Sequence, residues 1–146
     1  MKTSGIRIYD SNNNILAISL SDILEEIPKG SSYYWALLFI DGSPEKGCGH
    51  FFVEYKNKVN HSEKGLLINF DELNKLDSKF FQIYEVRLLA SMHPVLLRRY
   101  MTEEEMYKKC ELVIELIDCS FWEVHAHKKA LILNLQKKFQ QTKLLY

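Results

Sequence analysis

The sequence predicts an α+β fold in which one domain spans residues 1–146. Short runs of β-type residues dominate positions 1–90, whereas apolar side chains recur at helical spacing over positions 100–146. Strands followed by helices, instead of alternating with them, are typical of α+β folds. We therefore expect a mostly antiparallel sheet of about five strands, short helices and a C-terminal helical hairpin.

The composition disfavours several classes of protein. The 146 residues are 47% hydrophobic and 26% charged, which is ordinary for a globular domain. The 19 basic and 19 acidic side chains cancel, whereas a dedicated nucleic-acid binder is usually basic. No secretory signal and no apolar run of membrane-spanning length is visible, so we expect a cytoplasmic protein with no membrane partner and three reduced cysteines.

The N-terminal part predicts a hairpin and a short helix. GIRIYD and ILAIS flank the run SNNN, which favours a hairpin whose Asn residues adopt positive φ. Ser19 or Ser21 can then cap a helix that runs to Ile27 and stops at Pro28 and Gly30.

Residues 33–42, YYWALLFIDG, form the densest apolar stretch of the chain. Large apolar side chains on both faces predict a central strand, ending at Asp41-Gly42. After the loop GSPEKGCG, the run HFFVEYKNK places Phe51, Val53 and Tyr55 on one face, which predicts a strand exposed on the other. The two strands would pair as a hairpin.

Two further strands are expected before residue 90. GLLINF is one candidate, and Asp71 can start the helix that follows it. FFQIYEVRLLA is the other, and its Glu85 and Arg87 share a face that points to solvent or to a partner.

The C-terminal part predicts two helices. Thr102 begins the motif T-E-E-E and Ser120 begins S-F-W-E, and both motifs match a capping box. Apolar residues at spacings of three or four follow each motif. Two N-caps this close together imply two helices joined by a tight corner near Asp118.

We expect no catalytic residue, metal or cofactor. Cys48, His50 and Glu54 could ligate zinc or contain a nucleophile pair, but zinc needs about four ligands and no second pair lies at suitable spacing. His125 and His127, two residues apart on an expected helix, would face different sides. We interpret all of these as loop, surface or cap-proximal residues.

Two alternatives remain open. Basic doublets in the C-terminal part could bind nucleic acid, although acidic residues on the first expected helix make this partner less favoured. A group of strand aromatics could line a small-ligand pocket, although such residues more often form a core. The doublets are Arg98-Arg99, Lys108-Lys109, Lys128-Lys129 and Lys137-Lys138, and the aromatics are Tyr33, Tyr34, Trp35, Phe39, Phe51, Phe52 and Tyr55.

The runs YYWALLFIDG, GCGHFFVEY and FDEL, followed by a helical tail, resemble immunity proteins of bacterial polymorphic toxin systems, including contact-dependent growth inhibition. The resemblance implies a protein that binds a cognate toxin domain, such as a nuclease, and occludes its active site. Such an inhibitor needs a rigid scaffold and a complementary patch, with no catalytic group of its own. The neutral charge departs from the acidic character of many inhibitors of nucleases.

The expected partner-binding patch combines polar residues next to the apolar strands. Acidic side chains would face the cationic pocket of a nuclease, and aromatic and Arg side chains at the centre would supply most of the affinity. The sequence sets no oligomeric state. The patch residues are Asp41, Glu45 and Lys46 in the loop, His50, Glu54 and Lys56 on the next strand, and Glu85 and Arg87 on the late strand.

Overall fold

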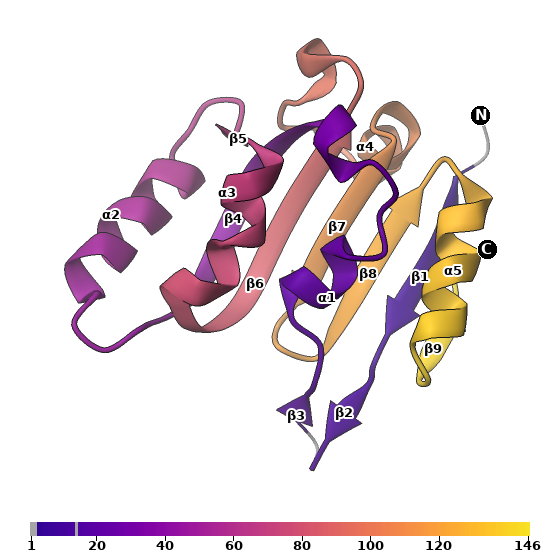
Figure 1. Cartoon of the computed structure of the whole chain (residues 1–146). Helices are drawn as coiled ribbons and strands as arrows, with labels where there is room; N and C mark the ends of the chain where they lie inside the picture. Colours follow the sequence, from indigo (N-terminus) through magenta and orange to yellow (C-terminus); the bar gives the residue numbers. More distant parts are fainter. Residues whose placement is uncertain (1–2, 14) are drawn as a thin grey trace.

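The chain is organised around an antiparallel sheet (Figure 1). The computed structural model describes residues 3–13 and 15–146. These residues form a seven-stranded sheet in the order β5-β4-β6-β7-β8-β1-β9, which is larger than the predicted sheet of about five strands, and a separate β2–β3 pair. The strands are β1 (Ser4–Ile8), β2 (Ser11–Asn12), β3 (Ile15–Leu16), β4 (Tyr34–Pro44), β5 (Leu66–Ile68), β6 (Phe80–Ser91), β7 (Leu112–Ile117), β8 (Phe121–Ala126) and β9 (Thr142–Leu144).

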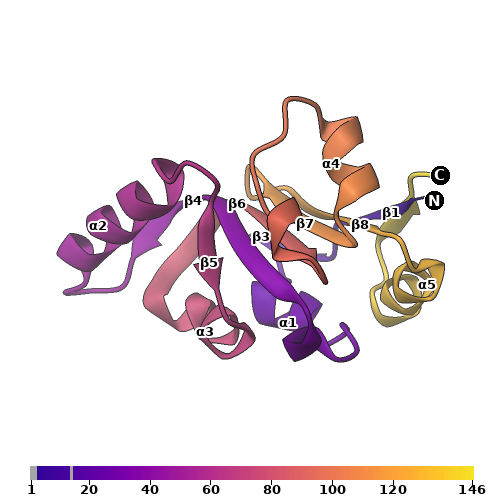
Figure 2. The same cartoon turned by 90° about the horizontal axis from the view of Figure 1, so that it is seen from above.

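Helices cover the two faces of the sheet unequally. Figure 2 shows α1, α3 and α5 on one face and α4 on the other, while α2 lies beside β4 near one edge of the sheet. The helices are α1 (Leu20–Leu24), α2 (Gly49–Asn60), α3 (Phe70–Asn74), α4 (Glu103–Lys109) and α5 (Lys129–Lys138), with 3-10 turns at Gly30–Ser32, Leu76–Lys79 and Pro94–Leu96. Within the described ranges, each helix is too short or too polar to cross a membrane.

The main core lies between the sheet and the face that carries α1, α3 and α5. Trp35 of β4 and Trp122 of β8 are its largest buried side chains. Each indole finds a buried acceptor, since Trp35 Nε1 donates to the Gly30 carbonyl and Trp122 Nε1 to the Ile18 carbonyl, both at 2.8 Å. A smaller cluster fills the other face beneath α4, where Leu89 and Val113 of the sheet pack with Met106.

The expected strand at YYWALLFIDG is confirmed as β4, and apolar residues are buried on both of its faces. A β-bulge between Leu37 and Phe39 shifts the alternation, so that Ile40 joins Trp35 and Leu37 in the main core and Phe39 reaches solvent. The predicted end at Asp41-Gly42 is wrong, because β4 continues to Pro44 along β6.

The predicted strand at HFFVEYKNK is wrong: Gly49–Asn60 forms α2. Phe52, Tyr55 and Val59 recur at spacings of three and four, and they turn toward the main core. The Asn60 side chain both accepts from the Ile40 amide and donates to the Ile40 carbonyl, each at 3.0 Å. The helix therefore covers the part of the β4 edge that extends past the short edge strand β5 and would otherwise have unpaired backbone groups.

The predicted C-terminal helical hairpin is also wrong. Thr102 does cap a helix, since its side chain accepts from the Glu105 amide, but α4 ends at Lys109. The next two apolar runs form β7 and β8, which pair as a β-hairpin through residues 118–120, where Asp118 and Cys119 have φ of 46° and 58°. Only α5 remains of the expected second helix.

The remaining expectations are mostly confirmed. Ser19 caps α1 in a capping box with Asp22, although α1 ends at Leu24 and not at Ile27 as predicted. GLLINF and FFQIYEVRLLA contain β5 and β6. Asn69, not Asp71, caps α3. The predicted N-terminal hairpin is wrong for β1, which pairs with β8 and β9; only β2 and β3 pair across Asn13, at φ 53°, and Asn14 lies outside the described residues.

Candidate functional site: the open face of the sheet

A charged row crosses the sheet on the face that carries α4. The register aligns Arg7 of β1 with Glu123 of β8, Glu123 with Glu115 of β7, and Glu115 with Arg87 of β6. Phe39 of β4 continues the row beside Arg87. We call Arg7, Glu123, Glu115 and Arg87 the charged ladder. We call the side of the sheet that carries α4 the open face, because α1, α3 and α5 all lie on the opposite side (Figure 2).

The two central carboxylates are like charges placed directly opposite each other, an arrangement that destabilises a sheet unless it is compensated. Both are buried, with Glu115 3% and Glu123 8% exposed. Arg87 Nε and Nη2 contact Glu115 Oε2 at 2.9 and 2.7 Å, and Arg7 Nε contacts Glu123 Oε2 at 2.9 Å. Each carboxylate thus has its own guanidinium, which is the condition for keeping a buried charge.

Three rings complete the polar contacts of the ladder. Glu123 Oε1 lies 2.6 Å from Nε2 of buried His125, and His125 Nδ1 lies 2.5 Å from the Tyr146 hydroxyl. Tyr107 of α4 stacks on the imidazole with a centroid distance of 3.6 Å and donates to Glu115 Oε1 at 3.0 Å. Gly5 makes room for this arrangement, because a Cβ there would lie 2.9 Å from His125 Nδ1.

The contacts of this network shift the pKa values of its members. The hydrogen bond from His125 lowers the pKa of Glu123 against the opposing effect of burial, and Arg7 lowers it further. Burial raises the pKa of Tyr107, with Glu115 adding to the effect, and burial likewise raises that of Tyr146. At neutral pH Glu123 is therefore ionised and both phenols remain hydrogen-bond donors, with both His125 nitrogens engaged.

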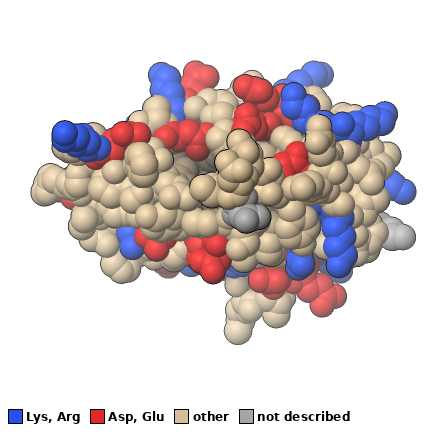
Figure 3. Space-filling model, turned by 90° about the horizontal axis from the view of Figure 1, so that it is seen from below, with Lys and Arg blue, Asp and Glu red and all other residues tan. Residues whose placement is uncertain are grey.

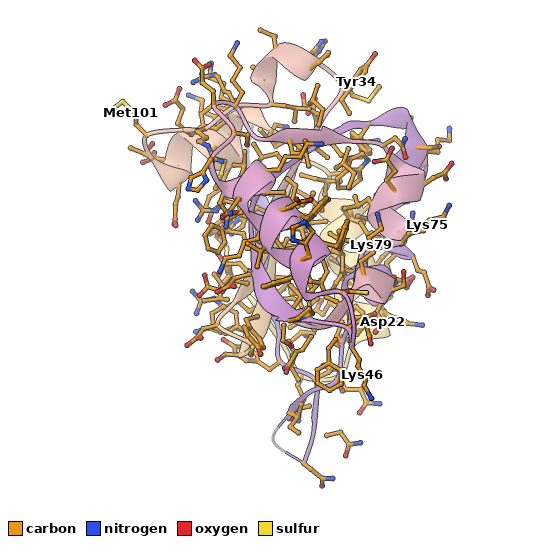
Figure 4. All side chains as sticks on the ribbon, turned by 90° about the vertical axis from the view of Figure 1, so that its left-hand side faces the viewer. Asp22, Tyr34, Lys46, Lys75, Lys79 and Met101 are labelled. Atoms are coloured by element: carbon orange, nitrogen blue, oxygen red, sulfur yellow. The ribbon has the colours of Figure 1, made fainter. Side chains whose placement is uncertain are left out.

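A cavity of about 440 Å³ opens on this face between the sheet and α4. Its apolar walls include Phe39, Met101 and Ile117, and its charged lining includes Glu85, Glu103 and the Arg87–Glu115 pair. Met101 is 98% exposed and projects from the segment before α4 (Figure 4). The open face thus combines a fixed charged row, exposed aromatic surface and a concave pocket.

The structure brings some of the predicted patch residues together. Asp41 pairs in register with Glu85, two residues along β6 from Arg87. Lys56 of α2 joins them through an ion pair of 2.8 Å between its Nζ and Asp41 Oδ1. These four residues, Asp41, Lys56, Glu85 and Arg87, therefore border one surface.

The other predicted residues lie elsewhere. His50 and Glu54 form an exposed pair one helical turn apart on α2, with 2.9 Å between Nε2 and Oε1. Glu45 and Lys46 are exposed in the preceding loop, and Lys46 lies at the lower end of the molecule (Figure 4). The predicted strand face shared by His50, Glu54 and Lys56 is wrong, because this segment forms α2.

The candidate metal ligands remain scattered. Cys48 precedes α2 as its N-cap residue without a side-chain hydrogen bond to the helix. His125 and His127 lie on or next to β8 rather than on a helix, and His127 Nε2 contacts the Tyr107 carbonyl at 3.1 Å. Across the described residues, no group of three or more His, Cys, Asp or Glu side chains is arranged to hold a metal ion.

The basic doublets do not share a helical hairpin as expected. Lys108-Lys109 end α4, whereas Lys128-Lys129 and Lys137-Lys138 lie at the two ends of α5 on the opposite face of the sheet. Acidic and basic side chains are interspersed on the side seen from below (Figure 3). Among the aromatics, Trp35 is buried in the core and stacks on Phe70, and both residues also line a pocket with Tyr33 and Tyr34.

Sequence reasoning missed most of the open face. Arg7, Glu115 and Glu123 were not singled out, because the last two were assigned to helices. The pattern that could have identified these residues is the spacing of two in LVIELI and FWEVHA, which is typical of strands and in which one Glu interrupts each apolar run. Known protein families, curated proteins and solved structures were all compared with the chain, and none matches it.

Proposed function

We propose that this chain is an immunity-type inhibitor, which binds a toxin domain of another protein through the open face and occludes its active site. The observation that carries the proposal is the charged ladder bordered by Phe39 and Phe121 on a rigid sheet. An inhibitor of this kind acts by fit and needs no bond-making group. The chain would bind the toxin in the cytoplasm.

The composition of the open face suits a protein partner. Arginine and aromatic side chains dominate the affinity of protein interfaces when they lie at the centre. Arg7 lies over the Phe121 ring at 4.8 Å, and Arg87 lies next to Phe39 in register. Both arginines are held by buried carboxylates, so little side-chain entropy is lost when they are covered.

The charge of this face favours a cationic partner. Asp41, Glu85, Glu115 and Glu123 place four carboxylates here against the guanidinium groups of Arg7 and Arg87, with Lys56 at the rim. A nuclease active site must attract phosphates and is therefore commonly cationic. Acidic side chains at the rim would speed association with such a site and compete with its substrate.

The test identifies the partner and then measures protection. The tagged chain is used to capture proteins from its native cells, and each captured protein is expressed alone and together with the chain. We expect one captured protein to arrest growth and the chain to restore it. If no captured protein is toxic, or if the chain leaves the arrest unchanged, the proposal is wrong.

Charge reversal then locates the surface. Asp41→Lys combined with Glu85→Lys should weaken binding at least about tenfold, since charge pairs at interfaces contribute about 1.5 kcal/mol or more. Glu45→Lys combined with Glu54→Lys is the matched control away from the open face, and we expect near-normal protection. The reverse result would place the contact on α2 and its loop.

A further inference from the structure

The cavity between the sheet and α4 carries an excess of negative charge. Three carboxylates line it, from Glu85, Glu103 and Glu115, against two guanidinium groups, from Arg87 and Arg99. Arg87 is bound to Glu115 at 2.7 Å, with a longer contact of 3.3 Å to Glu103. One negative charge is therefore uncompensated within the cavity.

Arg99 contributes little to neutralising Glu85 and Glu103, because its guanidinium is bound elsewhere. Its Nε donates to the Ser62 carbonyl at 3.0 Å and its Nη2 to the Val59 carbonyl at 3.1 Å. These carbonyls lie at the C-terminal end of α2, which carries partial negative charge and holds the guanidinium there.

Two acids remain accessible. The side chain of Glu103 is 65% exposed, and Glu85 is half-buried and forms no ion pair with any described residue. They come from different elements, β6 and the first residue of α4, and both face the same hollow. Both carboxylates therefore line the space that a cation would enter.

The lining of the cavity favours a cation that has an alkyl stem and a planar head group. Phe39, Met101, Met106 and Ile117 give the cavity an apolar lining that suits an alkyl stem, and the exposed ring of Phe39 offers a flat surface. A guanidinium group is planar, stacks on aromatic rings and binds carboxylates through paired hydrogen bonds, which an ammonium group does not do.

We propose that this cavity receives an arginine side chain of the toxin domain, an inference that rests on the proposed function and specifies its central contact. The stem lies against Met101 and Ile117, and the guanidinium bridges Glu85 and Glu103. An arginine held in this cavity could not bind a phosphate of the toxin's substrate. This would also explain how a small inhibitor blocks phosphate binding by the toxin.

The experiment uses a probe that needs no toxin. Labelled full-length protein is titrated with N-acetyl-arginine amide and, separately, with the neutral isostere N-acetyl-citrulline amide, while methyl signals of Ile117, Met101 and Met106 are followed by NMR. We expect saturable shifts at these methyl groups with the arginine compound only. Equal shifts with citrulline, shifts mapped elsewhere or no saturable shifts would overturn the inference.

Variants assign the binding to the two acids. Glu85→Gln and Glu103→Gln should each weaken binding of the arginine probe about three- to tenfold, the range of the net contribution of one typical hydrogen bond. Glu104→Gln, on the same helical turn but outside this cavity, is the matched control and should bind the probe normally. Unchanged binding in both of the first two variants would contradict the assignment.

The two proposals can fail separately. If the chain restores growth but the arginine probe gives no shifts, the cavity inference is wrong and the inhibitor function stands. If the probe binds as expected but no captured protein is toxic, the inhibitor function is wrong and the cavity remains a site for guanidinium groups.

Discussion

At the residue scale, the two buried glutamates are the most demanding feature of the molecule. A buried carboxylate without a partner costs several kcal/mol, and two opposed carboxylates add repulsion. Glu115 and Glu123 are retained because Arg87 and Arg7 lie on the outer strands of the same register row. Tyr107 and His125 supply the remaining donors, so the ladder is a single unit built from β1, β6, β7, β8 and α4.

Glu123 should make stability depend on pH. Its pKa is lowered below the ordinary 4.5 in the folded protein, so its stabilising contribution is complete above that value and is lost as the pH falls through the folded pKa. Glu123→Gln should reduce the free energy of unfolding by about 1–3 kcal/mol at pH 7. The difference from the wild-type protein should narrow toward pH 3.

Urea unfolding at a series of pH values measures this difference. The exposed Glu104→Gln is the control, and its stability should follow the wild-type curve throughout. A difference between Glu123→Gln and the wild-type protein that stays constant from pH 7 to pH 3 would show that ionisation of Glu123 does not contribute.

At the element scale, two segments of the chain fit both the spacing of a strand and the spacing of a helix. Residues 112–117 and 121–126 are apolar at almost every position, so spacings of two, three and four all find apolar residues. The S-F-W-E motif fits a helix cap locally, yet as β8 this segment pairs with both β7 and β1. Pairing on both edges satisfies the backbone of a buried segment as fully as a helix would, and tertiary packing decides between them.

The β7–β8 turn offers a direct test at this scale. Ser120 N donates to the Ile117 carbonyl at 2.8 Å and closes a β-turn whose two central residues, Asp118 and Cys119, both have positive φ. Asn-Gly adopts this conformation most readily. The double variant Asp118→Asn/Cys119→Gly should therefore raise the free energy of unfolding by about 0.5–1 kcal/mol. Thermal or urea unfolding measures it.

Ser120→Gly is the matched control for the turn. Ser120 lies next to the two turn residues but outside the set with positive φ, so glycine there should be neutral or destabilising. If Ser120→Gly stabilised the protein as much as the turn variant does, the conformation of the turn would not be the cause.

At the scale of the whole molecule, the sheet is strongest in the middle and weakest at its edges. β6, β7 and β8 are joined in register and have buried residues on both faces, whereas β5 and β9 are three-residue edge strands. The N-terminal strand β1 lies between β8 and β9, so its backbone is paired only once the last elements of the chain are in place.

Amide hydrogen exchange should report this gradient. We expect the slowest exchange at residues 86–90, 112–117 and 121–126 and much faster exchange at 66–68 and 142–144, because edge strands open locally at a lower free energy than the core. Measurement by NMR or mass spectrometry distinguishes the regions. Equal protection of β9 and β7 would mean that the sheet opens as one unit.

The sequence by itself determined the α+β class, the two-faced burial of β4, a helix capped at Ser19 or Ser21, the Thr102 cap and the strand that carries Glu85 and Arg87. These features depend on side-chain periodicity and on caps within a few residues, which are local properties. Only the tertiary structure decided that Gly49–Asn60 is a helix, that residues 112–126 form a hairpin and that Arg7 joins Glu123 across more than a hundred residues. Those outcomes depend on which partner buries each apolar face and pairs each backbone edge, and such partners are distant in sequence.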